Sequence, residues 1–233
     1  MGTVYNTNVV TDGIILYMDF GNRASYPGTG TTVTDLSGYG NDGTVVGSPT
    51  FDASLGLGAF DFDNGATKQI TVGTPSILQP ADAVTVAAWI RPHYAAENGA
   101  IWLTSDNGGS AGYRLIAYSS YIRFSINSYS SNAAKIPDSA TTAGTWYYVA
   151  GTYDKDKASD QIKIYLNGTC DWPADTYTSA ISYSSLQPFR VGGVPIHWTE
   201  SYDGFVGLVQ IYNRALSGSE LIQNYNAMKG RFT

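Results

Sequence analysis

The stretch from Tyr202 to Asn226 constrains the fold of this chain more than any other. Its first part, 205–212, reads FVGLVQIY and is apolar at both odd and even positions. Such a run predicts a strand that is buried on both faces, as in the middle of a β-sandwich. The period then changes, because Ser217 and Glu220 have the spacing of a capping box. We therefore expect a short helix to begin at Ser217, directly after the last strand.

Many short apolar runs separated by turn residues, among them 26 glycines, indicate an all-β chain. The expected strands are at 13–20, 44–46, 59–62, 69–72, 84–91, 100–103, 113–117, 121–126, 146–153 and 161–166. Hydrophobic residues make up 43% of the chain and charged residues 14%, which is enough to bury a sizeable core. We expect residues 1–12 to form an N-terminal arm or edge strand, and residues 13–233 to form one domain.

Three motifs resemble one known family in their order along the chain. They are DLSGYGNDGT at 35–44, VTVAAWIRP at 84–92 and IYNRALS at 211–217. Together they resemble a laminin-G-like domain of the concanavalin A-like lectin/glucanase superfamily, over about 13–230. The resemblance implies a two-sheet antiparallel jelly-roll sandwich with one short C-terminal α-helix. It implies much less about activity, because function lies in sites carried by a widely reused fold.

The glycine-rich turn at 35–43 has two open interpretations. Carboxylate, amide and backbone oxygens are the ligands that Ca²⁺ prefers, so the turn could be a calcium loop. The candidate ligands are Asp35, Asn41, Asp42 and Asp203. Alternatively, these side chains bond their own backbone in an Asx-rich turn. Some relatives in the resembled family place a metal near this turn, but many relatives also carry acidic residues in the last strand, where this chain has Gly207 and Leu208.

The region between Cys170 and Tyr202 is the least regular part of the sequence and is rich in aromatic side chains. Tyrosine and tryptophan offer rigid apolar faces with a polar edge, which suits stacking on sugar rings. The residues that we expect to form a ligand-binding rim are Trp172, Tyr183, Trp198 and Tyr202.

Catalytic motifs are absent from the sequence. Glycosidases of the resembled superfamily place closely spaced carboxylates on one strand, because hydrolysis needs a nucleophile and an acid a short distance apart. The chain has three glutamates, Glu97, Glu200 and Glu220, and none has an acidic residue two positions away. Neither histidine belongs to a nucleophile motif. We therefore expect no enzyme activity and no catalytic residues.

The net charge of −6 and the pI near 4.7 argue against a nucleic-acid partner, which needs clustered basic residues. No apolar run reaches the roughly 18 residues that span a bilayer, so we expect no membrane insertion. The single cysteine, Cys170, excludes an internal disulfide. The first residues lack the basic start and apolar core of a secretion signal, so export by that route is not expected.

Three functional hypotheses follow. The first is a virion-associated decoration or host-attachment protein, whose partners are other virion proteins or host-surface glycans. It depends on a resemblance of 26–32, 213–216 and 229–232 to laminin-G-like proteins of tailed phages and related viruses. The second is a bacterial secreted or cell-surface lectin-like domain, and the third, disfavoured by the missing motifs, is a glycoside hydrolase. In the first two a homo-oligomer would add avidity to weak sugar sites.

Overall fold

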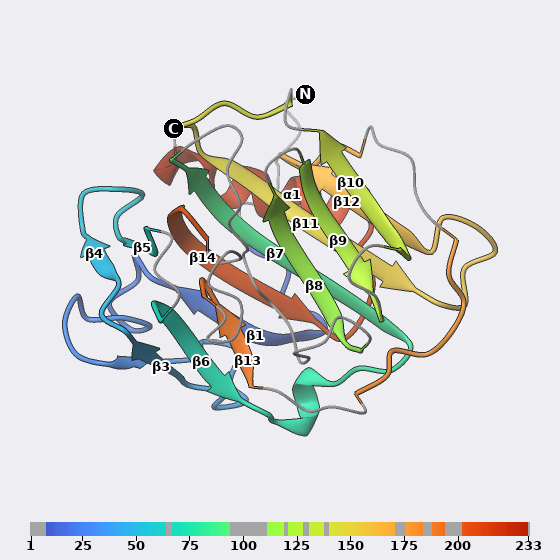
Figure 1. Ribbon diagram of the computed structural model, residues 1–233, viewed down its shortest axis with the longest axis horizontal. Helices are drawn as coiled ribbons and strands as arrows, with labels where there is room; N and C mark the ends of the chain where they lie inside the picture. The colour runs from blue at the N-terminus through green and yellow to red at the C-terminus, as the bar shows by residue number, and fades with distance from the viewer. Residues whose placement is uncertain are drawn as a thin grey trace.

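The computed structural model describes residues 8–63, 67–93, 111–118, 121–127, 131–137, 140–170, 176–183, 188–193 and 202–232 (Figure 1). The strands in this part of the chain are β1 (Ile14–Asp19), β2 (Thr32–Val33), β3 (Gly43–Val46), β4 (Thr50–Asp52), β5 (Ala59–Asp61), β6 (Gln69–Gly73), β7 (Ala83–Pro92), β8 (Tyr113–Tyr118), β9 (Tyr121–Ile126), β10 (Ala133–Pro137), β11 (Tyr147–Asp154), β12 (Ile162–Leu166), β13 (Phe189–Val191) and β14 (Gly204–Tyr212). The helical segments are η1 (Ser76–Leu78), α1 (Gly218–Met228) and η4 (Lys229–Arg231).

Strand β14 is the centre of a seven-stranded antiparallel sheet. Six of the strands have the order β12-β11-β7-β14-β5-β4, and the seventh, β1, pairs with β14. It pairs with β7 along one edge, and with β5 and then β1 along the other. Val206, Leu208, Val209 and Ile211 are fully buried. The prediction of a strand buried on both faces is therefore confirmed.

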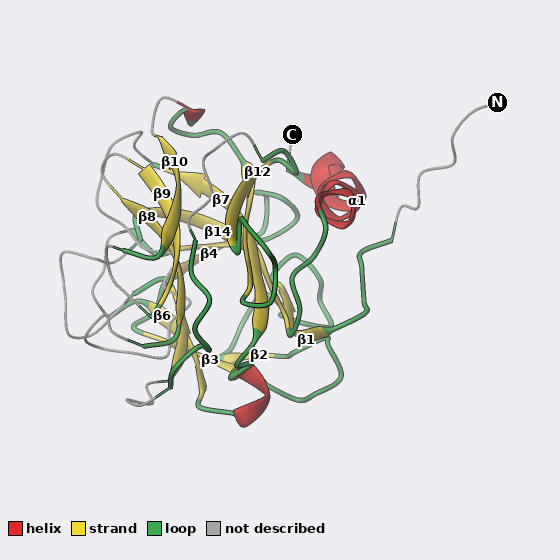
Figure 2. Cartoon of the chain, turned by 90° about the vertical axis from the view of Figure 1, so that its right-hand side faces the viewer, coloured by secondary structure: helices red, strands yellow, loops and turns green. Residues whose placement is uncertain are grey.

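Two smaller sheets form the second layer, a three-stranded sheet (β10-β9-β8) and a four-stranded sheet (β13-β6-β3-β2). Figure 2 shows the two layers edge-on. One buried cluster lies between them and includes Ile211 of β14, Leu115 of β8, Phe124 of β9 and Val191 of β13. The expected β-sandwich with a short C-terminal helix is thus confirmed, because both layers bury their inner faces against each other.

Helix α1 begins at the expected capping box. The Glu220 N–H donates to Ser217 Oγ, and the Ser217 N–H donates to Glu220 Oε2 at 2.8 Å. The helix covers the outer face of the seven-stranded sheet (Figure 2) and forms a second buried cluster there. In that cluster the ring of Trp89 on β7 stacks on Phe232, with 4.5 Å between ring centroids. Both faces of the central sheet are therefore covered by apolar packing.

Most of the expected strands are present, whereas β2, β4, β10 and β13 were not predicted. The strand expected at 100–103 lies outside the described residues. Residues 8–12 form no strand, and the Val10 N–H donates to Asn224 Oδ1 of α1 at 2.7 Å. The helical segments of the described chain are all too short to cross a bilayer, the longest having 11 residues.

Candidate functional site

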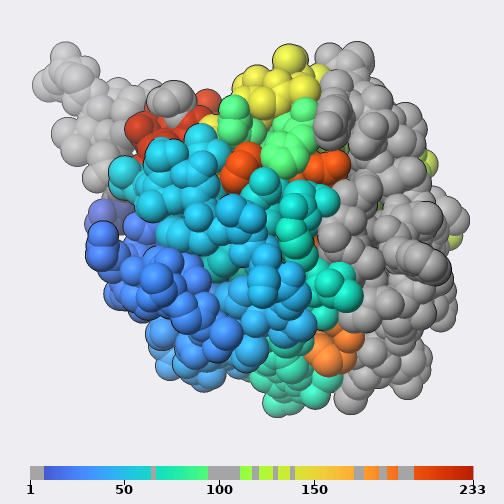
Figure 3. Space-filling model, turned by 60° about the vertical axis from the view of Figure 1, so that its left-hand side comes forward, coloured from blue at the N-terminus to red at the C-terminus, as the bar shows by residue number. Residues whose placement is uncertain are grey.

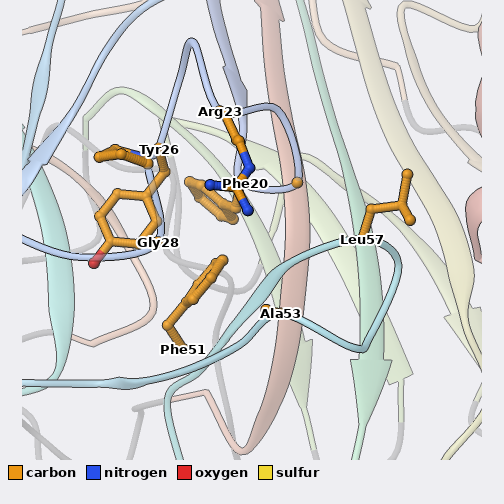
Figure 4. A pocket seen from close by; sticks show the side chains of 9 residues that line it. Phe20, Arg23, Tyr26, Gly28, Phe51, Ala53 and Leu57 are labelled. Atoms are coloured by element: carbon orange, nitrogen blue, oxygen red, sulfur yellow. The ribbon is translucent and has the colours of Figure 1, made fainter.

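A shallow pocket lies where the loop after β1 meets the loop after β4 (Figure 4). It holds about 300 Å³ of empty space, part of which is open solvent. The lining residues are Phe20, Gly21, Arg23, Tyr26, Pro27, Gly28, Phe51, Ala53 and Leu57. Figure 3 shows that the blue segment near the N-terminus and the cyan segment that follows it adjoin on one face of the molecule. The cavity itself measures about 70 Å³, which is below the size range of small-molecule sites, so it suits part of one sugar residue whose remainder stays in solvent.

The floor of the pocket is aromatic. The rings of Tyr26, Phe51 and Phe60 pack against one another, with centroid distances of 4.8 to 5.2 Å. Phe51 is half-buried, so part of its ring remains open to a ligand. The Tyr26 hydroxyl donates to the carbonyl of Gly30 at 3.0 Å, which closes the loop, and burial raises the pKa of this phenol. The floor is therefore held in place by the core beneath it.

Among the described residues, Arg23 is the only charged one that lines the pocket. It is exposed, and Figure 4 shows its guanidinium pointing into the pocket beside the ring of Phe20. Within the described part of the chain it has no ion pair. A guanidinium in this position presents several N–H donors to the oxygen atoms of a ligand.

Leu57 forms the opposite wall and is 65% exposed. Its backbone has φ of +68°, a left-handed conformation that side chains with a Cβ disfavour. The preceding turn is held by Asp52, whose Oδ1 accepts from the N–H and the hydroxyl of Ser54. An exposed apolar side chain on a strained backbone beside a pocket is a candidate ligand contact.

A family profile described as the concanavalin A-like lectin/glucanases superfamily matches residues 64–222, more than half of the 233 residues. The chain belongs to this superfamily. A comparison with curated protein sequences finds no match.

Solved structures share the fold of this superfamily member at low sequence identity. One is a botulinum neurotoxin type C structure whose description states that cell entry depends on two ganglioside molecules (16% identity, TM-score 0.67, covering 94% of this chain and 52% of that chain). Another is a Trypanosoma rangeli sialidase (15% identity, TM-score 0.66, 95% and 33%). A third is domain 4 of the Geobacillus stearothermophilus arabinanase AbnA with arabinotriose (16% identity, TM-score 0.65, 91% and 98%). The chain spans about half the length of the neurotoxin chains.

The expected ligand-binding rim is only partly visible. Trp172 and Trp198 lie outside the described residues. Tyr183 is half-buried, its hydroxyl donates to the Pro80 carbonyl at 2.9 Å, and burial raises its pKa. Tyr202 is 1% exposed, so the prediction that its ring faces a ligand is wrong: the ring belongs to the buried cluster between the layers.

The candidate calcium ligands do not form one site. Both oxygens of Asp35 are used by the protein, since they accept from the N–H groups of Tyr17, Ser37 and Asn41 and from the Ser37 hydroxyl. Asp42 Oδ1 accepts from the Asp35 N–H at 2.9 Å. These bonds are those of an Asx-rich turn.

Asp203 lies far from this turn. It precedes β14 and lies roughly 20 Å along that strand from Gln210. Gln210 pairs with Tyr17, whose N–H donates to Asp35 in the turn. No group of three metal-ligating residues of the usual acidic, histidine or cysteine types occurs among the described residues. Asp35 and Asp203 therefore do not bind one ion together, and calcium at 35–43 stays a prediction.

Asp203 instead belongs to a cluster around His93 at the end of β7. His93 Nδ1 lies 2.7 Å from Asp203 Oδ1, and His93 Nε2 lies 3.6 Å from Asp61 Oδ1. Burial raises the pKa of Asp61. The imidazole fills the space between the two carboxylates, where a glycosidase would need its substrate.

The pocket itself was not predicted from the sequence. Its aromatic lining comes from Phe20, Tyr26 and Phe51, which have no common period and come from separate elements and loops. The signal that could have indicated it is the presence of aromatic residues in and directly beside two glycine-rich loops, because aromatic rings brought together by such loops pack against each other. Which loops meet is decided by the sheet pairing, which the sequence does not display.

Proposed function

We propose that this chain is a non-catalytic glycan-recognition module and that the pocket of Figure 4 binds one sugar residue. The observation that carries the proposal is the combination of the partly open ring of Phe51 with the guanidinium of Arg23. Sugars have an apolar ring face and a rim of hydroxyl groups. An aromatic floor with one donor-rich side chain above it matches both features.

Membership in a superfamily of lectins and glucanases supports this proposal. The descriptions of related folds mention gangliosides, a sialylated ligand and arabinotriose, and each statement concerns that protein alone. If the chain were a hydrolase, the cluster of Asp61, His93 and Asp203 would be its candidate catalytic site. The imidazole is hydrogen-bonded to Asp203 and lies 3.6 Å from Asp61, so it occupies the space between the carboxylates, and binding without hydrolysis is the better proposal.

The test is a glycan array with an oligomeric form of the protein, followed by titration calorimetry of the best glycans. Arg23→Gln and Phe51→Ala should each weaken binding by about 10-fold or more. Phe51→Ala could lose binding simply because it misfolds. Arg23 is exposed, so Arg23→Gln should fold normally, and a loss of binding in that variant would be due to the site. Tyr39→Ala, at an aromatic residue that is 57% exposed outside the pocket, is the matched control and should bind normally.

If Arg23→Gln and Phe51→Ala both bind glycans as tightly as wild type, the sugar binds to another surface and the pocket is not the site. A glycan-specific rise in reducing ends that disappears in Asp203→Asn would instead establish a hydrolase.

We further propose that the module works on the surface of a virus particle, with a secreted or cell-surface lectin-like domain as the alternative. The support is the sequence resemblance at 26–32, 213–216 and 229–232. Weak single sites on many copies would give avidity on a particle. Mass spectrometry of purified particles tests this setting, and absence of the chain from them would favour the alternative.

A further inference from the structure

The outer face of the second layer carries three buried arginines. Arg114 of β8, Arg123 of β9 and Arg190 of β13 are each flanked by residues of the core between the layers. Because side chains alternate along a strand, all three point away from that core. They are nevertheless 1%, 1% and 8% exposed, although arginine is among the residues least often fully buried. Arg114 donates to the carbonyl of Ala111, and Arg123 donates to the hydroxyl of Tyr121.

Arg190 ends a row of hydroxyl groups that crosses the four-stranded sheet. Thr32 of β2 pairs with Thr44 of β3, Thr44 pairs with Thr71 of β6, and Thr71 pairs with Arg190. Directly paired residues point to the same side of a sheet. Thr32 and Thr44 are exposed and Thr71 is half-buried, so the row leads from the solvent to the guanidinium.

Two polar groups at the buried end of this row lack partners within the described residues. Nη1 of Arg190 has no hydrogen-bond acceptor, and Oε1 of Gln69, which is 7% exposed, has no donor. Gln69 lies on the same strand and the same face as Thr71, diagonally from Arg190. Burial lowers the pKa of Arg190. An unpaired buried cation and an unpaired amide both destabilise a fold, which points to a ligand that completes them.

We propose that Arg190 and Gln69 form a subsite for an acidic saccharide, separate from the pocket of Figure 4. The unpaired donor requires an anionic acceptor, which the carboxylate of a sugar acid supplies. The unpaired acceptor requires a donor, which a ring hydroxyl of the same sugar supplies. The threonine hydroxyls of Thr71 and Thr44 can then bond the next sugar residue. No residue of the pocket belongs to the strands of this sheet.

The test is calorimetry with trigalacturonic acid and with its neutral methyl ester as a matched probe. Wild type should bind the acid about 10-fold or more tightly than the ester. Arg190→Met and Gln69→Leu should each reduce this preference, whereas Arg23→Gln in the pocket should leave it unchanged. Inorganic sulfate should compete weakly, and competition as strong as that of the saccharide would overturn the assignment of a sugar.

Thermal melting of the Arg190 variant shows whether a loss of acid binding is due to a loss of folding. Replacing an unpaired buried ion by an apolar side chain of similar volume is neutral or stabilising, so Arg190→Met should melt no lower than wild type. A clearly lower melting temperature would show a structural role and would overturn the proposal, as would a variant that keeps the acid preference.

If neutral glycans bind through Arg23 and Phe51 but the acid has no advantage, this subsite fails and the proposed function stands. If the acid binds through Arg190 while pocket variants have no effect on any glycan, the pocket fails and the subsite stands.

Discussion

The guanidinium of Arg231, in the last turn of the chain, forms a two-point ion pair with the carboxylate of Asp19 at the end of β1. Nη1 and Nη2 each lie 2.7 Å from a carboxylate oxygen. The same guanidinium donates to the carbonyl of Gly56 at 3.0 Å. Asp19 precedes the loop that forms one wall of the pocket, and Gly56 lies in the loop that forms the other. One side chain from the C-terminus thus fixes both walls.

We expect Arg231→Met to destabilise the fold by about 3 kcal/mol, because removing one partner leaves a buried, uncompensated Asp19 carboxylate. Denaturant unfolding would measure this loss. Lys229→Met, at an exposed cation two residues away, is the control and should change stability by less than about 0.5 kcal/mol. Equal effects of the two substitutions would contradict a specific role of the ion pair.

The helix cap should give the fold an acid-sensitive component. The hydrogen bond from Arg214 is the main cause that lowers the pKa of Glu220 from 4.5 to about 2. Since the folded pKa is depressed, the stabilisation is fully present above pH 4.5 and is lost as the pH falls through about 2. Glu220→Gln should therefore be less stable than wild type near neutral pH, and this difference should shrink toward zero in strong acid. A difference that stays constant with pH, measured by chemical denaturation, would show that the charge of Glu220 is unimportant.

Gly151 in β11 lies against the ring of Phe124 in the other layer, and an added Cβ would collide with that ring. Gly151→Ala should destabilise the sandwich by about 1 to 3 kcal/mol, because the layers would have to separate locally. Gly218→Ala, where the Cβ would meet only an ordinary contact at 3.8 Å, is the matched control. Similar melting temperatures for both variants would mean that the layers can adjust at Gly151.

Chelation should leave the melting temperature unchanged, because the oxygens of Asp35 are already satisfied by protein donors. A bound ion would stabilise the native state, so a lower melting temperature with chelator would restore the calcium hypothesis. In contrast, Asp35→Ala should destabilise the turn by about 2 to 3 kcal/mol through loss of several buried hydrogen bonds.

Local signals were sufficient to predict the centre of the fold and insufficient to predict the site. β14 and the cap of α1 are readable because their residues are adjacent in the sequence and obey one period or one spacing. β2 has two residues, Thr32 and Val33, and exists only through pairing with β3. The pocket depends on Arg231, which lies 175 residues from Gly56. Contacts of this separation follow from topology and leave no local pattern.

Leu57 allows stability to be separated from function. Its φ of +68° disfavours any side chain with a Cβ, so Leu57→Gly should stabilise the fold by up to about 1 kcal/mol. If the exposed side chain contacts a sugar in the pocket, the same substitution should weaken glycan binding several-fold. Leu57→Asn is the companion variant, because asparagine tolerates this conformation but lacks the apolar surface. A gain in stability with unchanged glycan affinity would remove Leu57 from the site, and lower stability in both variants would show that the side chain is part of the packing.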